Sequence, residues 1–271
     1  YLRHLLDDAA WHLVVILGTG RSGKNRLALE TAARAAHTFV HGVCFVSLAA
    51  VSSLEVVPST VAEALAAALS GKADPHDQLI AYLREKELLL VLDNLEHLPA
   101  ADGWISRLIQ SCPDLRLLVT SRERLNLHGE RLLELNGLDV PPGKQAEGAT
   151  DYSAAQLFLN RAREAMPDFV LNAKNETAVI RICQLVNGLP LAIELAAAWV
   201  RHLTCHEIAY EIEQNLSFLA TTQKNVPVRH RSLQAAFEHS WALLSDDERT
   251  AFARLAVFRG GCTREAATAV T

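Results

Sequence analysis

The sequence predicts an α/β fold, in which a P-loop (phosphate-binding loop) on a parallel sheet is followed by a helical region. Strand-like and helix-like segments alternate as far as about residue 140, whereas helix-like segments alone follow. This alternation is typical of a parallel sheet whose strands are joined by right-handed crossovers. Two aliphatic runs support the assignment most strongly, because each ends in residues that bind phosphate or metal in other proteins.

The first of these runs belongs to the stretch LVVILGTGRSGKN at residues 13–25. Its aliphatic part ends at Gly18, a glycine-rich turn follows, and Lys24 begins a helix-like segment, which gives the order strand, Gly-x-x-x-x-Gly-Lys loop and helix. Backbone N–H groups of such a loop and the positive end of the helix dipole bind phosphate oxygens. We therefore predict a phosphate site formed by Gly18, Thr19, Gly20, Arg21, Ser22, Gly23, Lys24, Asn25 and Arg26.

The second run is part of LLLVLDNLEHL at residues 88–98. Its five consecutive aliphatic residues predict a strand buried on both faces, and this strand delivers Asp93 at its C-terminal end. Open parallel sheets bind ligands at that end of their strands. With the P-loop upstream, Asp93 is expected to serve Mg²⁺, whereas in isolation it would be read as an ordinary strand terminator.

The residue after Lys24 departs from the usual motif, which has a Ser or Thr whose hydroxyl binds Mg²⁺. Asn25 stands there instead. An amide carbonyl can ligate Mg²⁺, but its oxygen lies one bond further out than a hydroxyl, and Mg²⁺ tolerates little deviation from octahedral geometry. We expect Asp93 and Asn25 to form a weakened metal site.

Local signals predict the other elements of the α/β region. A short helix is expected at 1–10. Asp74 and Pro75 mark the start of one helix, and Ser59 or Thr60 is the expected cap of another, which should end at Gly71. Arg122 follows a strand and is placed to contact a γ-phosphate, with a solvated surface arginine as the alternative. The expected helices are 24–36, 59–69, 74–86 and 103–111, and the expected strands are 42–48, 115–121 and 130–135.

Residues 141–150, rich in Pro, Gly and polar residues, are the expected boundary of the α/β region. Gly188 and Pro190 read as a helix C-cap followed by a helix start. Ser245 and Glu248 form a capping-box pattern before another helix. Further expectations are helices at 151–165, 174–187, 190–202 and 205–216, a second boundary at 221–229, a break at the glycines 260–261 and a last helix from about Thr263.

The composition excludes several classes of function. The 271 residues have a formal net charge of −5 and no long basic run, so we expect no direct nucleic acid contact by this segment. The five cysteines fit no zinc spacing and read as free thiols in a reducing compartment. No apolar run reaches the ~20 residues of a membrane helix, so we expect a cytoplasmic protein without membrane contact. The missing initiator Met indicates a piece of a longer protein.

Taken together, several stretches resemble the bacterial NB-ARC-like ATPase modules of multidomain transcriptional regulators, which belong to the STAND class of P-loop NTPases (signal-transduction ATPases with numerous domains). The resemblance covers nearly the whole chain, and its motifs come in the family order. It rests on GTGRSGKNRLALE, LLLVLDNLEHL, LLVTSRERL, NGLPLAIELAAAWV and RHRSLQAAFEHSWALLSDDERTAFARLAVFRGG.

The resemblance implies an AAA+-like nucleotide domain at 1–140, a helical domain at 150–222 and the start of a winged-helix domain at 229–271. It also implies that ADP and ATP are the ligands, that Lys24 binds their phosphates, that Asp93 serves Mg²⁺, that Arg122 senses the γ-phosphate, and that Pro190 packs near the adenosine. ADP would hold the domains closed, and exchange for ATP would open them for assembly into a homo-oligomer or for release of an output domain. The expected partners are thus the nucleotide, other domains of the full-length protein and further copies of it.

The sequence departs from the family at the position after Asp93. Asn94 stands where many related ATPases carry a Glu that activates water, and Glu96 is the candidate substitute. We therefore expect a nucleotide-gated switch with slow or marginal ATPase activity, in which Asp93, Glu96 and Arg122 carry any hydrolysis. A degenerate module that acts as a scaffold without using nucleotide is the main alternative. DNA binding by the C-terminal helices ranks lower, because no helix there has a basic face.

Overall fold

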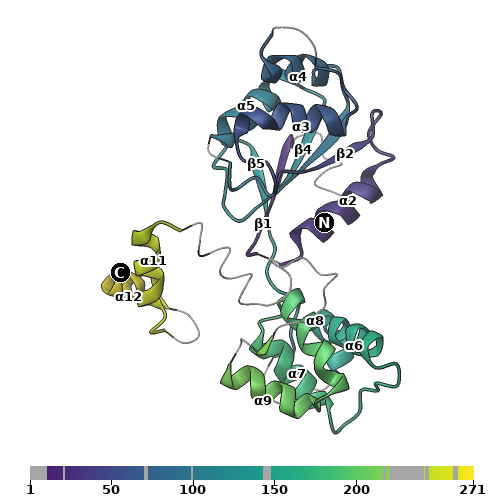
Figure 1. The fold of residues 1–271 in the computed structure, drawn as a ribbon, viewed down its shortest axis with the longest axis vertical. Coiled ribbons are helices and arrows are strands. Elements are labelled where there is room, and N and C mark those ends of the chain that lie inside the picture. The colour runs from purple at the N-terminus through teal and green to yellow at the C-terminus, as the bar shows by residue number, and fades with distance from the viewer. Residues whose placement is uncertain are drawn as a thin grey trace. The chain divides into compact units, whose positions relative to one another are not determined.

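The computed structural model describes residues 11–20, 22–69, 73–98, 100–142, 148–215, 218–219, 241, 244–258 and 262–271. Several expectations lie wholly or partly outside these residues. They are the helix at 1–10, the loop residue Arg21, the helix end at Gly71, residues 143–147 of the boundary at 141–150, the boundary at 221–229 and the break at 260–261. The chain divides into two compact units, Tyr1–Gly137 and Leu138–Thr271, and each is described by itself (Figure 1).

The first unit is built on a sheet that has five strands within the described residues, in the order β2-β3-β4-β1-β5. Every neighbouring pair is parallel, as the sequence predicts. Leu17 lies opposite Ser121, and Ser47 lies opposite Asp93, so the C-terminal ends of the strands meet at one edge. The strands are β1 (Leu13–Leu17), β2 (Val43–Ser47), β3 (Leu88–Asp93), β4 (Leu115–Ser121) and β5 (Glu130–Glu134).

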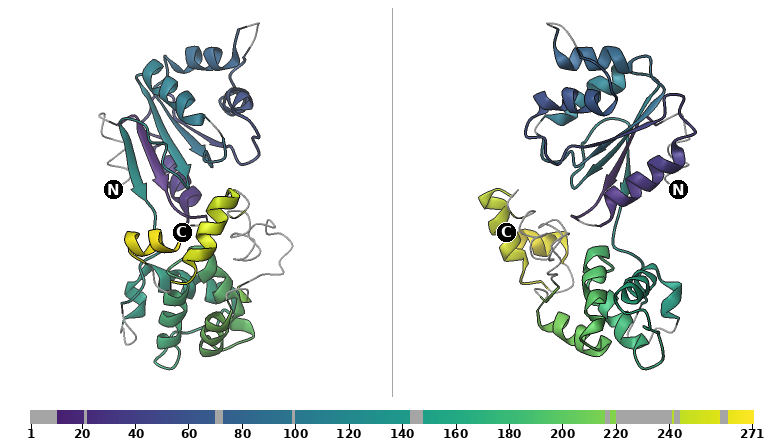
Figure 2. Two further views of the ribbon diagram at one scale, coloured as in Figure 1. Left: turned by 90° about the vertical axis from the view of Figure 1, so that its left-hand side faces the viewer. Right: turned by 45° about the vertical axis from the view of Figure 1, so that its right-hand side comes forward.

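Helices cover both faces of this sheet, which explains why the inner strands β1 and β3 are almost entirely aliphatic. Because side chains alternate along a strand, Leu88, Leu90 and Leu92 of β3 join one core cluster, and Leu89 and Val91 join the other. One face packs against α2 (Lys24–Ala35), and the other packs against α3 (Val57–Ala64), α4 (Pro75–Leu83) and α5 (Ala101–Ser111) (Figures 1 and 2).

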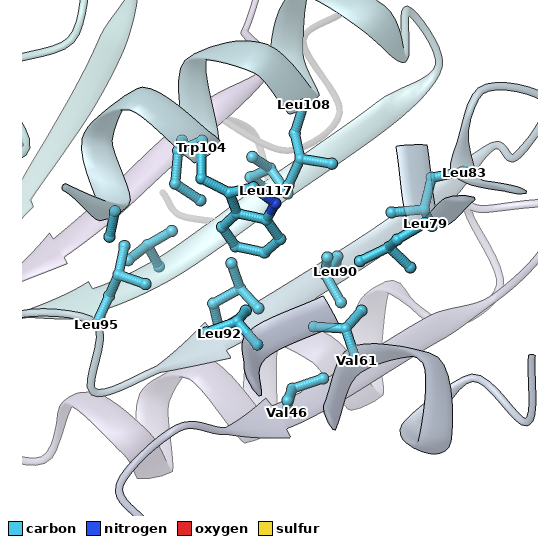
Figure 3. Close-up of a cluster of buried hydrophobic side chains, with 14 of the residues drawn as sticks. Val46, Val61, Leu79, Leu83, Leu90, Leu92, Leu95, Trp104, Leu108 and Leu117 are labelled. Atoms are coloured by element: carbon cyan, nitrogen blue, oxygen red, sulfur yellow. The ribbon is translucent and has the colours of Figure 1, made fainter. Parts of the chain in front are cut away.

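The larger cluster is centred on β3 and α5. Figure 3 shows Trp104 and Leu108 of α5 above Leu90 and Leu92, with Val61 of α3 on the opposite side of the cluster. Each of these side chains is almost fully buried, and burial of a large apolar side chain stabilises a fold by roughly 1.5–3 kcal/mol. This packing fixes β3 and therefore the position of the residues that follow it.

Among the helices of the first unit, α3 differs most from its expected limits. A 3-10 turn at Leu54–Val56 leads into α3, which begins at Val57 rather than at Ser59 or Thr60 and has Pro58 in its first turn. The helix ends well before Gly71, because Ala66 adopts a left-handed conformation (φ 50°) and terminates it. In contrast, Asp74 caps α4 as predicted and accepts hydrogen bonds from the backbone N–H groups of the next turn.

The second unit has its own core, and the regular elements around it are helices within the described residues. The four helices expected between 151 and 216 are present, with α6 packed against α8 and α7 against α9. The capping box of Ser245 and Glu248 and the last helix after Thr263 are also confirmed. These elements are α6 (Ser153–Ala165), α7 (Glu176–Leu185), α8 (Pro190–Ala198), α9 (Cys205–Gln214), α11 (Asp246–Leu255) and α12 (Arg264–Val270).

The described residues add two general observations. All five cysteines are free thiols, and four of them are buried. Across the described ranges, no helix combines the length and the apolar character that crossing a bilayer requires.

Candidate functional site

The glycine-rich loop after β1 lies at the edge where the strands end. Gly18 follows the strand directly, and a Cβ atom there would lie 2.7 Å from both the Leu135 carbonyl oxygen and Ser22 Oγ. Glycine is therefore required for the close approach of the loop to the segment after β5. Gly23 (φ 95°) ends the loop, and α2 begins at Lys24.

Lys24 points back into the loop. Its side chain is buried, with the residue only 7% exposed, and Nζ donates hydrogen bonds to the carbonyl oxygens of Gly18 (2.6 Å) and Thr19 (2.8 Å). Burial lowers the pKa of Lys24 from its ordinary value, nearby Glu96 and Asp93 oppose that shift, and Arg122 adds to it. The loop thus carries a cation held at its centre and close to two carboxylates.

The loop also contains donors that an anion would satisfy. The Ser22 hydroxyl is buried and has no hydrogen-bond partner among the described residues. The first N–H groups of any α-helix have no partner inside the helix, and those of α2 follow the loop directly. Buried polar groups are normally paired, so a buried hydroxyl and a helix N-terminus beside an ammonium group favour binding of a phosphate-like anion.

Asp93 ends β3 and is 2% exposed. Its Oδ1 accepts a hydrogen bond from Thr120 Oγ1 and its Oδ2 accepts one from Asn25 Nδ2, both at 2.6 Å. The carboxylate therefore joins three elements, β3, β4 and α2. Thr120 is a site residue that sequence analysis missed, although a polar residue near the end of an aliphatic strand is the same signal that revealed Asp93.

A second set of contacts fixes the turn after β3. Asn94 adopts a left-handed conformation (φ 67°), and its N–H donates to Thr120 Oγ1 at 3.0 Å. Its side-chain Nδ2 lies 3.1 Å from His97 Nδ1, and His97 Nε2 lies 2.8 Å from the Val51 carbonyl oxygen. Asn94 therefore positions the turn, and nothing in the sequence predicted this network.

Glu96 and Arg122 form an ion pair between the segments after β3 and β4, with Arg122 Nε 3.0 Å from Glu96 Oε1. The Glu96 side chain is 5% exposed and that of Arg122 is 21% exposed, so Arg122 is not the solvated surface residue of the alternative reading. The second oxygen of Glu96 is buried and has no hydrogen-bond partner within the described ranges. The pair therefore keeps a guanidinium at the same edge of the sheet as Lys24.

The structure thus brings together most of the predicted residues at one edge: the described loop residues, Lys24, Asn25, Asp93, Glu96 and Arg122. Arg26 is exposed on the first turn of α2. Pro190 is the first residue of α8, as expected, and belongs to the second unit, so its expected contact with adenosine stays a prediction.

The donor set does not fit a Mg²⁺ ion held directly between Asn25 and Asp93. The amide faces the carboxylate with its N–H group, and an amide nitrogen that donates a hydrogen bond is not a metal ligand. Among the described residues, no group of three or more His, Cys, Asp or Glu side chains is arranged to hold a metal ion. The sequence predicted a weakened metal site of Asp93 and Asn25. The observed orientation of the amide does not fit direct coordination of a metal ion by Asn25.

Comparison with known proteins identifies relatives but no matching protein-family model. A protein of Mycobacterium tuberculosis named as a candidate HTH-type transcriptional regulator is 36% identical over 259 residues, which cover 95% of this chain and 28% of that protein. An uncharacterized protein of the same organism is 36% identical over 270 residues, which cover 99% of this chain and 66% of that protein. The chain therefore spans only part of the length of these relatives.

Two solved structures share the fold at low sequence identity. Cdc6p from Pyrobaculum aerophilum aligns with a TM-score of 0.55 and 14% identity over 89% of this chain and 79% of its own. The Aeropyrum pernix ORC2 protein, solved as ADPNP–ADP complexes, aligns with a TM-score of 0.52 and 17% identity over 95% of this chain and 71% of its own. The predicted α/β fold with an AAA+-like P-loop is thereby confirmed.

Proposed function

We propose that this chain, an AAA+-like P-loop fold related to a mycobacterial protein named as a candidate transcriptional regulator, is an ADP/ATP-binding switch of the STAND or NB-ARC type. One observation carries the proposal: buried Lys24 and the unpartnered Ser22 hydroxyl lie in a glycine-rich loop at the N-terminus of α2. This combination suits the phosphates of a nucleotide, which supply several charged acceptor oxygens at once.

In this proposal the loop from Gly18 to Asn25 surrounds the phosphates. Lys24 leaves the Gly18 and Thr19 carbonyl oxygens to contact phosphate, and the Ser22 hydroxyl gains its missing partner. Loop and helix N–H groups supply the other hydrogen bonds. Pro190 is proposed to contact the adenosine.

Arg122 is proposed to distinguish ATP from ADP. Without a γ-phosphate, the guanidinium is paired with Glu96 at 3.0 Å. A γ-phosphate near Lys24 would compete with Glu96 for the guanidinium, because charge-assisted bonds from Arg to phosphate are strong and directional. A ligand that makes different contacts in two conformations shifts the equilibrium between them. The exchange of Glu96 for phosphate as the partner of Arg122 would therefore couple the bound nucleotide to the conformation of the protein.

Replacing Arg122 by Ala tests this assignment. We expect ATP affinity to fall by about tenfold, or about 1.4 kcal/mol, with ADP affinity changed less than threefold, because the γ-phosphate alone loses its contact. Competition of each nucleotide against a fluorescent ADP analogue measures both values. Arg107→Ala, which breaks an exposed ion pair between α5 and Asp77 of α4, is the matched control. If the substitution weakened the binding of ADP and ATP equally, or of neither, Arg122 would not be the residue that distinguishes them.

Hydrolysis is proposed to be slow or marginal. Asn94 replaces a potential general base and is used to position the turn. Glu96, the candidate substitute, is held by Arg122 and would activate water only after that pair separates. The chain is therefore proposed to control, through its bound nucleotide, an output domain elsewhere in the protein, with other domains and further copies as partners.

A scaffold that has lost nucleotide use is the second candidate. The observation that favours it is the hydrogen bond from Asn25 to Asp93, which occupies the position where a metal ion is expected. Nucleotide binding distinguishes the two candidates, because a scaffold of this kind would bind neither ADP nor ATP.

A further inference from the structure

The contact between Asn25 and Asp93 takes the place in which a metal ion was expected. Asp93 is buried, and each of its two oxygens accepts a hydrogen bond from an uncharged side chain, Thr120 or Asn25, at 2.6 Å. Hydrogen bonds to the charged form stabilise a carboxylate. The negative charge of Asp93 is therefore stabilised by hydrogen bonds from the protein itself.

The orientation of the Asn25 amide follows from this geometry. A reversed amide would place Oδ1 rather than Nδ2 2.6 Å from Asp93 Oδ2, which would bring two acceptors together without a proton between them. The N–H group must face the carboxylate. The amide thus presents partial positive charge to Asp93 on the side from which a cation would otherwise approach.

Positive charge for the phosphates is already available nearby. Lys24 and Arg122 interact electrostatically with each other, and Lys24 also interacts with both Glu96 and Asp93. Mg²⁺ binds through near-ideal octahedral geometry and depends on one or two available carboxylates. Here one nearby carboxylate is bound to Asn25 and Thr120, and the other is bound to Arg122.

We propose that this chain binds ADP without a divalent cation, with the Asn25 amide taking the place of the ion between α2 and Asp93. This inference rests on the proposed nucleotide site and goes beyond it, since a P-loop with Ser or Thr after the lysine positions Mg²⁺ through that hydroxyl. The side chain of Asn25 is then a positioning group that makes metal unnecessary for binding.

Titration of ADP in excess EDTA and in excess MgCl₂ tests the inference on the wild-type protein. We expect dissociation constants within about threefold of each other, a difference of about 0.7 kcal/mol. A loss of about tenfold or more in EDTA would overturn the inference and leave the proposed nucleotide site intact. Absence of ADP binding in both buffers would overturn the proposed function and this inference with it.

Asn25→Asp is the sharpest variant, because it keeps the shape of the side chain and replaces the donor by a second carboxylate beside Asp93. Two carboxylates in contact repel each other, so ADP affinity should fall at least about tenfold in EDTA (about 1.4 kcal/mol) and recover with Mg²⁺. Asn25→Thr should likewise make ADP binding depend on Mg²⁺. Unchanged affinity of Asn25→Asp in EDTA would contradict the role of the amide.

Thermal unfolding in the same two buffers separates these effects from general loss of structure. Asn25→Asp is expected to unfold at a lower temperature in EDTA than in MgCl₂, whereas wild-type protein should unfold at the same temperature in both. Asn160→Asp, at an exposed position of α6, is the matched control and should behave as wild type. A dependence on MgCl₂ in the control as large as that in Asn25→Asp would overturn the inference.

Discussion

ADP affinity is expected to fall by about 100-fold when Lys24 is replaced by Met, which keeps most of the aliphatic stem and removes the charge. Lys24 is buried and donates hydrogen bonds to the Gly18 and Thr19 carbonyl oxygens, so its ammonium group is held in the loop where we propose that the phosphates bind. Hydrogen bonds to charged groups contribute about 1.5–3 kcal/mol, and a loss of about 2.7 kcal/mol corresponds to 100-fold. Titration with a fluorescent ADP analogue measures the change.

The same substitution at an exposed lysine provides the comparison. Lys174→Met, in the second unit, should bind ADP as wild type does. Circular dichroism of both variants checks that the fold is retained. ADP affinity of folded Lys24→Met within threefold of wild type would show that the P-loop is not the phosphate site.

Gly188→Ala is expected to destabilise the second unit by about 3 kcal/mol or more, which is large for a single substitution. Gly188 is buried between α7 and α8 and has φ +65°, a conformation that L-residues with a Cβ rarely adopt. An added Cβ would overlap the Leu138 carbonyl oxygen and lie 2.9 Å from the Leu138 nitrogen. The Gly188 carbonyl also accepts a 2.8 Å hydrogen bond from that nitrogen, so the backbone cannot move away without losing it.

Gly103→Ala is the control for this prediction. Gly103 lies inside α5, and a Cβ there would meet no atom within 4 Å. Because Ala is favoured over Gly inside a helix by up to about 1 kcal/mol, this variant should be neutral or more stable than wild type. Chemical denaturation followed by circular dichroism compares the two, and equal stability of both variants would contradict the strain assigned to Gly188.

Much of the fold could be predicted because it depends on local patterns. The aliphatic run of β3 identified a strand buried on both faces, and the alternation of elements identified a parallel sheet. The limits of α3 were wrong, because its end depends on the left-handed conformation of Ala66, a residue type that gives no such signal. Pro190 begins α8 as its residue type predicted, whereas the C-cap of α7 is Val186 and the left-handed Gly188 lies two residues beyond it.

The residues of the site were easier to predict than their partners. Lys24 and Asp93 follow from motifs, whereas the bond from Asn25 to Asp93 depends on how α2 lies over the end of β3. The pair of Glu96 and Arg122 likewise joins segments after two neighbouring strands. Such contacts depend on strand order, which the sequence pattern leaves open, and Asn25 therefore looked like a poor metal ligand rather than a partner of Asp93.

Equilibrium dialysis of labelled ADP against nucleotide-free protein tests the proposed switch most directly, because every other step depends on a nucleotide in the loop. We expect saturable retention of one ADP per chain that unlabelled ATP displaces. Retention that does not saturate, or that unlabelled ATP does not displace, would contradict nucleotide binding and favour the scaffold.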